Sequence, residues 1–462
     1  MDNKGDLILG IEKNKEYILS IEDNGFNGEG IGKIDGFTIF VPDAIKGEVV
    51  KVIIIKKTIS YAIGKIIDFI EKSKYRIQDL DCNSYKKCGG CNLRHMDYNY
   101  TLELKKEIVI NCLNKEKIYN VNVKNTIGMG NPYNYRNKLQ YPVGIDKQGK
   151  PVMGVYARRS HDIVKNSLCG IQNLNANIIA QDVFKYLIES GIKPYNEKNQ
   201  SGDLRHIVVR NGNITNEIML ILVLNNKKCI INKKFIDFIT NKYNNIKTIV
   251  LNYNLKNTNV IFGKENKTIF GDGYIYDILG DYKFKISPLS FYQVNSVQAE
   301  VLYNIAIENS NINRNDIVLD LYCGIGTIGI FASKFAKMVY GIEIVEDAVK
   351  DAIENAKINN IENIQFFCGD IEKVLDNILN KIEYKPNIVF VDPPRKGLDK
   401  NTINVLNKIK PNKIVYISCN PATFARDIKL LVDKNYSIDT AQPVDMFPFT
   451  SNVECVAVLC LK

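Results

Sequence analysis

The sequence predicts a multidomain protein with an N-terminal antiparallel β-barrel, a β-rich central domain and a C-terminal doubly wound α/β domain. Its 462 residues correspond to about two to four domains of ordinary size. β-Branched runs separated by glycine turns fill residues 10–72, which is typical of a small barrel. Strands and helices alternate from about residue 285, which predicts a layered α/β domain. We place the domains at residues 1–75, 76–281 and 282–462.

The composition is that of an ordinary globular protein, with 45% hydrophobic and 24% charged residues. No apolar run approaches the ~18 residues of a membrane span. The start of the chain, MDNKGDLILG, is acidic where a secretory signal is basic. We therefore expect a cytoplasmic protein that does not associate with membranes. In that reducing compartment, eleven cysteines indicate metal binding or catalysis more than disulfides.

The net charge of +10 is concentrated in the middle of the chain. Residues 76–281 hold 30 basic and 18 acidic residues, whereas the flanking regions hold 11 against 12 and 20 against 21. A concentrated surplus indicates an electrostatic footprint for a polyanion, although a solvated basic face would give the same count. The candidate phosphate contacts are Arg136, Lys138, Arg158, Arg159, Arg205 and Arg210.

The first domain also contains a recognisable sequence motif. Its stretch GEGIGKIDGFTIFVPDAIKGE and the later YAIGKI resemble a TRAM domain, an RNA-binding module similar to the oligonucleotide-binding fold. The resemblance implies that the barrel contacts RNA. Its near-zero net charge favours the alternative that the barrel only packs against its neighbours.

The rest of the chain divides into three kinds of segment. Residues 100–115 place apolar side chains along one stripe, which predicts an amphipathic helix. Residues 120–281 have mostly the pattern of short strands with Gly and Asn turns. After a helix near 293–309, the alternating strands and helices predict a Rossmann-like sheet with its ligand site at the carboxyl ends of the strands.

The segment IVLDLYCGIGTIGIFAS, residues 317–333, predicts a nucleotide-like ligand site. A buried strand ends at Asp320, and the glycines after it allow a tight turn into the next helix. Glu343 ends the following strand about twenty residues later, where a carboxylate can accept ribose hydroxyls. The spacing alone fits either a dinucleotide or S-adenosylmethionine.

Three further motifs place reactive side chains at strand ends. Asp392 of NIVFVDPPRKGL follows an apolar strand and begins a loop made rigid by two prolines. Cys419 of KIVYISCNPATFARD ends the next strand, where a thiol is presented at the sheet edge. Glu454 of PVDMFPFTSNVECVAVLCLK interrupts a core-forming run, which is costly unless the charge has a role or a partner; an edge strand with Glu454 in solvent is the alternative.

Together these motifs resemble the RNA uracil-5 methyltransferase family, with FYQVN at 291–295, DLYCGIGTIGI, VDPPRKG, SCNPATFARD and the terminal NVE at 452–454. The resemblance covers residues 285–462 and implies a class I methyltransferase fold. It implies S-adenosylmethionine as cofactor, Cys419 as nucleophile and Glu454 as general base. The residues that it implies as cofactor contacts are Gln293, Tyr322, Glu343 and Asp392. This chain has Asn452 where the family has histidine.

The implied chemistry follows from the weak nucleophilicity of uracil carbon 5. Addition of the Cys419 thiolate to carbon 6 creates an enolate, so that carbon 5 can accept a methyl group. Glu454 then removes the carbon 5 proton, and the thiol leaves by elimination. Both groups can be reached only by a uridine that is flipped out of its stack.

Cys82, Cys88 and Cys91 form a C-x5-C-x2-C run that requires a cation and a fourth ligand. His95, Cys112 and Cys169 are the candidates for that ligand, and zinc or a four-iron four-sulfur cluster is chemically allowed. The run resembles the ribosomal-RNA branch of the family. That resemblance implies a 4Fe-4S cluster held by Cys82, Cys88, Cys91 and Cys169. The spacing differs from that of radical S-adenosylmethionine enzymes.

We therefore expect an enzyme that transfers a methyl group from S-adenosylmethionine to carbon 5 of a specific uridine in 23S ribosomal RNA. The alternative substrate is the thymine-loop uridine of transfer RNA. A non-catalytic RNA-binding ribosome-assembly factor is the alternative from another class. We expect a monomer without an obligate protein partner.

Overall fold

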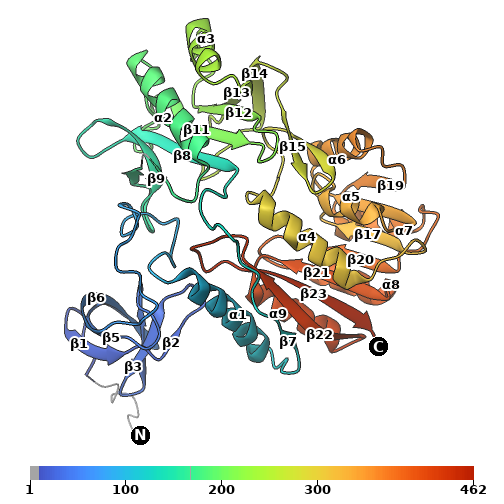
Figure 1. Ribbon diagram of the computed structural model, residues 1–462, viewed down its shortest axis with the longest axis horizontal. Helices are drawn as coiled ribbons and strands as arrows, with labels where there is room; N and C mark the ends of the chain where they lie inside the picture. The colour runs from blue at the N-terminus through green and yellow to red at the C-terminus, as the bar shows by residue number, and fades with distance from the viewer. Residues whose placement is uncertain (1–9, 167) are drawn as a thin grey trace, which may run out of the picture.

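The computed structural model describes residues 10–166 and 168–462 and contains three bodies in chain order (Figure 1). The barrel, the central sheet and the C-terminal α/β domain lie side by side around the middle of the molecule. The acidic start of the chain, on which the expected lack of a secretory signal depends, falls largely outside the described residues. Among the helices of the described residues, none is both long and apolar enough to cross a membrane.

The N-terminal body is a six-stranded barrel with strand order β1-β5-β6-β4-β3-β2. It closes because the Glu22 amide, between β1 and β2, donates to the Ile31 carbonyl of β3 over 2.8 Å. One pair, β4 with β6, is parallel, so the predicted barrel is confirmed but is not wholly antiparallel. Its strands are β1 (Glu16–Ser20), β2 (Asp23–Asn24), β3 (Gly30–Ile34), β4 (Phe37–Val41), β5 (Val49–Lys57) and β6 (Tyr61–Glu71).

The central body is a seven-stranded sheet with order β10-β9-β8-β11-β12-β13-β14. Alternate residues of β11 and β12 face two different cores: Ile207 and Leu220 face helices α2 and α3, whereas Val208 and Ile221 face the C-terminal domain. Burial on both faces explains why β12 is continuously apolar. The elements are β8 (Lys138–Ile145), β9 (Pro151–Tyr156), β10 (Ile163–Lys165), α2 (Leu174–Glu189), β11 (Leu204–Asn211), β12 (Ile218–Leu224), α3 (Lys233–Lys242), β13 (Ile246–Tyr253) and β14 (Glu265–Phe270).

Two helices of this body did not follow from the strand pattern expected over 120–281. Each begins at an asparagine whose side chain accepts a backbone N–H: Asn173 caps α2 and Asn232 caps α3. In α2, Ile179, Val183 and Leu187 are buried at helical spacing. The signals of a helix were therefore present among the surrounding strands.

The C-terminal body is built on an eight-stranded sheet with order β19-β18-β17-β20-β21-β23-β22-β7. The first five strands in that order are parallel and β23 is antiparallel to β21, with helices on both faces, which confirms the predicted α/β domain. The elements are β15 (Ile275–Leu279), β16 (Tyr282–Ile286), α4 (Ser296–Ser310), β17 (Ile317–Leu321), α5 (Thr327–Ser333), β18 (Met338–Glu343), α6 (Glu346–Ile358), β19 (Ile364–Cys368), α7 (Ile371–Leu379), β20 (Ile388–Val391), α8 (Lys400–Ile409), β21 (Lys413–Ser418), α9 (Pro421–Val432), β22 (Tyr436–Val444) and β23 (Glu454–Leu461).

One segment from the middle of the sequence belongs physically to this C-terminal body. Helix α1 (Tyr98–Lys115) buries Leu104, Ile108 and Leu113 in the same core as α9 and β22. Strand β7 (Asn122–Val123) then pairs with β22 and forms the edge of the large sheet. The chain therefore visits the C-terminal body once before it builds the central sheet (Figure 1).

Candidate active site and cysteine cavity

Cys419 and Glu454 meet where β21 and β23 lie side by side. Ser418 of β21 faces Cys455 of β23 in the antiparallel register, so the next residues on the two strands are Cys419 and Glu454. Cys419 directly precedes Asn420, which caps α9 by accepting the Ala422 amide over 3.1 Å. Glu454 is 4% exposed. The two residues predicted as nucleophile and base thus occupy adjacent positions at the carboxyl edge of the parallel strands.

The electrostatics of this pair depend on one neighbouring loop. Burial, together with the carboxyls of Glu454 and Asp392, raises the pKa of Cys419 to about 12. Burial also raises the pKa of Glu454 to about 8 and that of Asp392 to about 7. Arg395 lowers the pKa of both Cys419 and Glu454. Arg395 is thus a cation poised to favour the charged forms of both groups.

The loop that carries Asp392 and Arg395 is fastened to the turn that carries Cys419. The Asn420 side-chain amide donates to the Arg395 carbonyl over 3.0 Å, and the Thr423 hydroxyl donates to it over 3.3 Å. Because parallel strands β20 and β21 end at the same edge, Asp392 and Cys419 leave the sheet together. The fold therefore fixes the relative position of the nucleophile and the loop.

The glycine-rich turn after β17 is built around Glu343. The Glu343 carboxylate accepts the Gly324 amide over 3.2 Å and the Val345 amide over 2.8 Å. Gly324 has φ +55°, and a Cβ there would meet nothing within 4 Å, so the turn is open on the side where a ligand would approach. Tyr322 has φ +66°, and its hydroxyl lies 3.3 Å from that of Thr402.

Gln293 and Asp392 both lie near the buried hydroxyl of Tyr303 in α4. The pKa of the buried Tyr303 hydroxyl is raised well above its ordinary value, by burial and then by Asp392; a hydrogen bond with Gln293 opposes the rise, and Glu454 and Asp320 add to it. Three predicted site residues, Gln293, Asp392 and Glu454, therefore lie close to one buried phenol.

Asp320 is a residue that the sequence analysis noted as a strand end without giving it a role. Its Oδ2 accepts the Gly329 amide over 2.9 Å, whereas its buried Oδ1 has no hydrogen-bond partner among the described residues. Burial raises its pKa to about 8. A buried carboxyl oxygen without a partner at the cofactor turn fits a donor group on a bound ligand. Its position four residues before Gly324 was the available signal.

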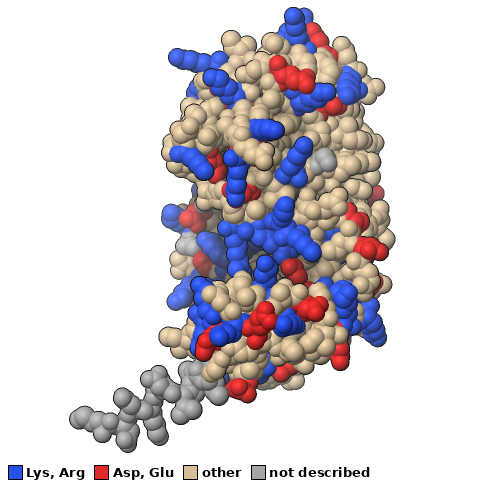
Figure 2. All heavy atoms as spheres, turned by 90° about the vertical axis from the view of Figure 1, so that its left-hand side faces the viewer, with Lys and Arg blue, Asp and Glu red and all other residues tan. Residues whose placement is uncertain are grey.

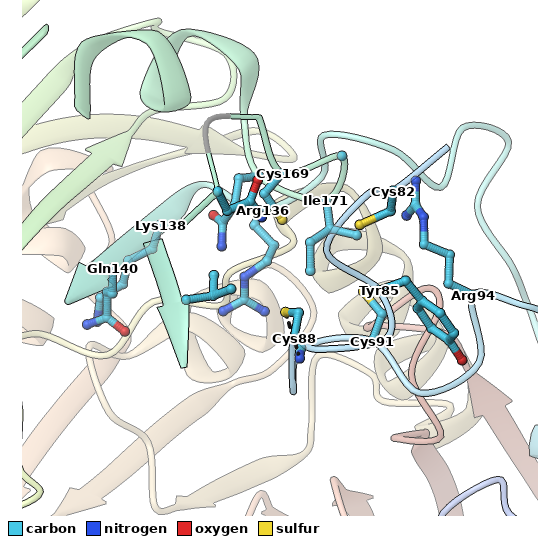
Figure 3. A pocket seen from close by; sticks show the side chains of 15 residues that line it. Cys82, Tyr85, Cys88, Cys91, Arg94, Arg136, Lys138, Gln140, Cys169 and Ile171 are labelled. Carbon is cyan, nitrogen blue, oxygen red and sulfur yellow. Dashed lines mark hydrogen bonds between the residues drawn. The ribbon is translucent and has the colours of Figure 1, made fainter. Parts of the chain in front are cut away.

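The cysteines Cys82, Cys88, Cys91 and Cys169 line one cavity of about 260 Å³ (Figure 3). Cys88 is placed there because its loop adds to the edge of β9, with the Gly89 amide donating to the Tyr156 carbonyl. Cys169 is held by Asn177 of α2, which bonds both its amide and its carbonyl over 3.2 Å. Two segments about 80 residues apart thus deliver four thiols to one space.

The surroundings of these thiols suit thiolate ligands. The Gly90 amide donates to Cys88 Sγ over 3.2 Å. Burial raises the pKa of Cys169, and the backbone amides of Ile171 and Gln172 oppose that rise. The Arg94 guanidinium packs closely over Gly170, where a Cβ would lie 2.9 Å from it.

The geometry separates the alternatives for the fourth ligand. His95 is buried and hydrogen-bonded to Tyr85, and neither His95 nor Cys112 lines the cysteine cavity. Within residues 10–166 and 168–462, no three His, Cys or carboxylate side chains are arranged closely enough to hold a single metal ion.

The basic residues proposed as phosphate contacts divide into exposed and structural ones. Arg205 and Arg210 are each 4% exposed and donate to backbone carbonyls, of Asn254 and Ser290 respectively, so their prediction as RNA contacts is wrong. Arg158 is half-buried and paired with Asp43 of the barrel over 3.0 Å. Arg159 is exposed and lines a hollow of about 700 Å³ between the barrel and the cysteine loop.

Figure 2 shows Lys and Arg side chains gathered across the hollow between the barrel and the central sheet. Phe40 and Tyr61 of the barrel line the same hollow, with ring centroids 5.5 Å apart. Burial, together with the nearby Arg210 and Arg136, lowers the pKa of Lys138, which lines the cysteine cavity, to about 7. A groove that combines cations with aromatic rings is typical of sites for single-stranded nucleic acid.

Comparison with known proteins gives this architecture a family. The model of the tRNA (uracil-5-)-methyltransferase family matches residues 229–462, and that of the TRAM domain matches residues 12–67. An uncharacterized RNA methyltransferase of Clostridium acetobutylicum is 44% identical over 455 residues, which cover 98% of both chains. One from Halalkalibacterium halodurans is 42% identical, again with 98% of both chains covered.

A solved structure is similar over nearly the whole chain. The tRNA (uracil-54, C5)-methyltransferase of Pyrococcus abyssi, in complex with S-adenosyl-L-homocysteine, has a TM-score of 0.75 and 28% identity, and covers 95% of this chain and 99% of its own. The fold is that of an S-adenosylmethionine-dependent RNA methyltransferase. The chain belongs to the uracil-5 methyltransferase family, which excludes the non-catalytic alternative.

Proposed function

We propose that the protein methylates carbon 5 of a uridine through a covalent adduct with Cys419, and that Glu454 is the base that resolves the adduct. The observation that carries this proposal is the adjacency of Cys419 and Glu454 at the end of paired strands, beside Asp392 and Arg395. A nucleophile and a base with different environments suit a reaction that adds first and eliminates later.

S-adenosylmethionine fits the turn after β17, where Gly324 leaves open space and Asp320 keeps an oxygen without a partner. When bound, it supplies an electrophilic sulfonium methyl group. We propose Gln293, Tyr322, Glu343 and Asp392 as its contacts. The positions of three of these residues support the proposal. Glu343 accepts the Gly324 amide and so shapes the turn, and Gln293 and Asp392 both lie near Tyr303.

The steps assigned to the chain are an addition and an elimination. The Cys419 thiolate forms a bond to carbon 6, and the negative charge delocalises onto carbon 5 and oxygen 4, which makes carbon 5 nucleophilic. Arg395 and the start of α9 favour the thiolate. After carbon 5 has been methylated, Glu454 takes its proton, and the carbon–sulfur bond breaks to restore the double bond and Cys419.

We propose that the substrate is 23S ribosomal RNA. The support for this is the C-x5-C-x2-C run of cysteines, which resembles that of the ribosomal-RNA branch of the family. The thymine-loop uridine of transfer RNA is a second candidate, because the similar Pyrococcus abyssi enzyme acts on uracil-54 of tRNA. That enzyme covers 95% of this chain, so the presence of a barrel does not by itself exclude tRNA. Mapping 5-methyluridine in both RNAs from a deletion strain separates the two.

We also propose that Cys82, Cys88, Cys91 and Cys169 hold a 4Fe-4S cluster. The support is their shared cavity of about 260 Å³ and the backbone amides directed at Cys88 and Cys169. Hydrogen bonds to the sulfurs are among the means by which proteins stabilise such clusters.

The test of the covalent mechanism is to stall each step separately. Cys419→Ala is expected to abolish methyl transfer and to trap no RNA, because carbon 5 never becomes nucleophilic. Glu454→Gln is expected to transfer the methyl group but to release product ~10²- to 10⁴-fold more slowly. It should therefore leave a labelled protein–RNA adduct on a denaturing gel run after incubation with methyl-labelled cofactor.

Two exposed residues serve as matched controls for that experiment. Cys460→Ala and Glu362→Gln change the same residue types away from the site and are expected to turn over normally. RNA containing 5-fluorouridine should trap the wild-type enzyme, since fluorine cannot leave as a proton. Methylation by Cys419→Ala would disprove the covalent mechanism, and normal turnover by Glu454→Gln would place the base elsewhere.

A further inference from the structure

The cysteine loop, residues 82–96, holds the segment of chain that leads into Glu454. The Ser451 amide donates to Asn92 Oδ1 over 2.9 Å, and Asn92 Nδ2 donates to Ser451 Oγ over 2.9 Å. The Leu93 amide donates to the Phe449 carbonyl over 3.0 Å. These contacts join parts of the chain more than 350 residues apart, three to five residues before Glu454.

Phe449 links the same segment to the cysteine cavity itself. It has φ +65°, a conformation that residues with a side chain keep only where the surroundings hold them. Its ring is 2% exposed and packs with Tyr135 and Ile171 in a small core that Cys91 and Cys169 also contact. The Arg94 guanidinium lies 4.5 Å from the ring centroid.

The start of the segment is fixed by other elements. Lys105 of α1 pairs with Asp445, and the side chains of Asn295 and Gln298 at the start of α4 bond the carbonyls of Met446 and Asp445. Residues 445–447 are therefore anchored to the helices, whereas residues 449–451 are anchored to the cysteine loop. Strand β23 begins at Glu454, immediately after this second anchor.

We propose that Asn92 is a positioning residue for Glu454, and that the cysteine loop thereby sets the second half of the reaction. The inference rests on the proposed role of Glu454 as the base. Through Asn92 and Leu93 the loop fixes where β23 starts, and so where the buried Glu454 carboxyl lies relative to Cys419. A displacement of a base by about 1 Å can slow its step by ~10²-fold.

The test is whether loss of the Asn92 contacts slows the resolving step alone. Asn92→Ala is expected to lower kcat at least about tenfold. The KM for RNA and the single-turnover rate of methyl transfer should stay near wild type, so the labelled adduct accumulates on a denaturing gel. Ser451→Ala, which removes only the partner hydroxyl, should show the same defect to a smaller degree. Asn83→Ala, an exposed asparagine of the same loop, is the matched control and should behave as wild type.

Hydrogen exchange gives a readout that does not depend on activity. In the folded Asn92→Ala protein the Ser451 amide should lose protection, whereas helix α1 should keep it. Asn92 also donates to the Asn27 carbonyl of the barrel, so a purely structural role would raise the KM for RNA, leave kcat unchanged and trap no adduct. That result would overturn the proposal. If wild-type enzyme were not trapped by 5-fluorouridine RNA, the proposed function itself would fail, and this inference with it.

Discussion

At the scale of single residues, the site is defined by carboxyl groups that are buried at strand ends. Burial raises the pKa of Asp320 and Glu454 to about 8 and that of Asp392 to about 7. Groups poised near neutral pH in a cleft are candidates for acid–base roles. Arg395 acts in the opposite direction on Glu454 and on Cys419. Burial therefore raises the pKa values of these groups, and the nearby Arg395 opposes the rise for Glu454 and Cys419.

The raised pKa of Glu454 predicts a pH dependence for product release. Glu454 must be ionised to take the carbon 5 proton, so release should accelerate as pH rises and level off above a value of about 8. Methyl transfer should keep rising beyond that point, because the pKa of Cys419 is raised to about 12. Rapid-quench measurements of adduct formation and decay separate the two steps. A decay rate independent of pH through this range would contradict the assignment of Glu454.

At the scale of elements, helix α1 is attached to the site by a buried ion pair. Lys105 pairs with Asp445 at 0% exposure of both side chains, and Tyr98 donates to the other oxygen of Asp445 over 2.8 Å. Lys105 also donates to the Phe447 carbonyl over 3.1 Å. The helix thus fixes the exit of β22 at the point where the chain turns toward Glu454.

Breaking this pair should be strongly destabilising. Lys105→Ala leaves the Asp445 carboxylate buried without its partner, so we expect unfolding in denaturant to show a loss of ~3–5 kcal/mol. Lys115→Ala, an exposed lysine in the last turn of the same helix, should change stability by no more than about 0.5 kcal/mol. Equal effects of the two substitutions would show that the pair contributes nothing specific.

The cysteine loop gives a second prediction at this scale. Protein purified without oxygen should be brown and contain about four irons per chain, as one four-iron cluster requires. Cys169→Ala should lose the colour and the iron, because Cys169 lines the cavity with the other three thiols. Cys112→Ala, outside that cavity, should keep both. Colourless protein with stoichiometric zinc that survives Cys169→Ala would favour the His95 alternative.

At the scale of the whole molecule, Lys and Arg side chains gather across the hollow between the barrel and the central sheet (Figure 2). Arg159, on the turn after β9, lines this hollow, and Lys86 and Lys87 are exposed on the cysteine loop, whose Gly89 and Asn92 also line it. Arg158 next to them is committed to Asp43 and to the carbonyl of Cys88. Exposed basic residues at the hollow are therefore available to RNA, whereas Arg158 next to them is used in contacts within the protein.

Salt dependence of RNA binding tests this surface. Each phosphate contact on a single strand contributes about 0.7 to the slope of log affinity against log salt. Replacing Lys86, Lys87 and Arg159 by alanine should weaken binding and flatten the slope by up to about 2. Replacing Lys233 and Lys234, which are exposed at the start of α3, should change neither. An unchanged slope in the first variant would show that these residues are merely solvated.

The sequence by itself determined the local features of the protein. β-Branched runs and glycine turns specified the barrel, and alternating strands and helices specified the α/β domain, because both patterns depend on neighbours within a few residues. Asp392 and Cys419 were placed at strand ends for the same reason. Their expected convergence followed from the rule that parallel strands end at one edge.

Only the tertiary structure decided which distant residues meet. Arg205 and Arg210 have the chemistry of phosphate contacts, but long-range packing buried them against backbone carbonyls. Cys169 lines the cysteine cavity, whereas His95 and Cys112 do not, because α2 and the edge of β9 bring two remote segments together. The hydrogen bond from the Ser451 amide to Asn92 joins residues that are 359 positions apart in the sequence. Such contacts leave no periodic trace in the sequence, since they arise from the packing of whole elements against one another.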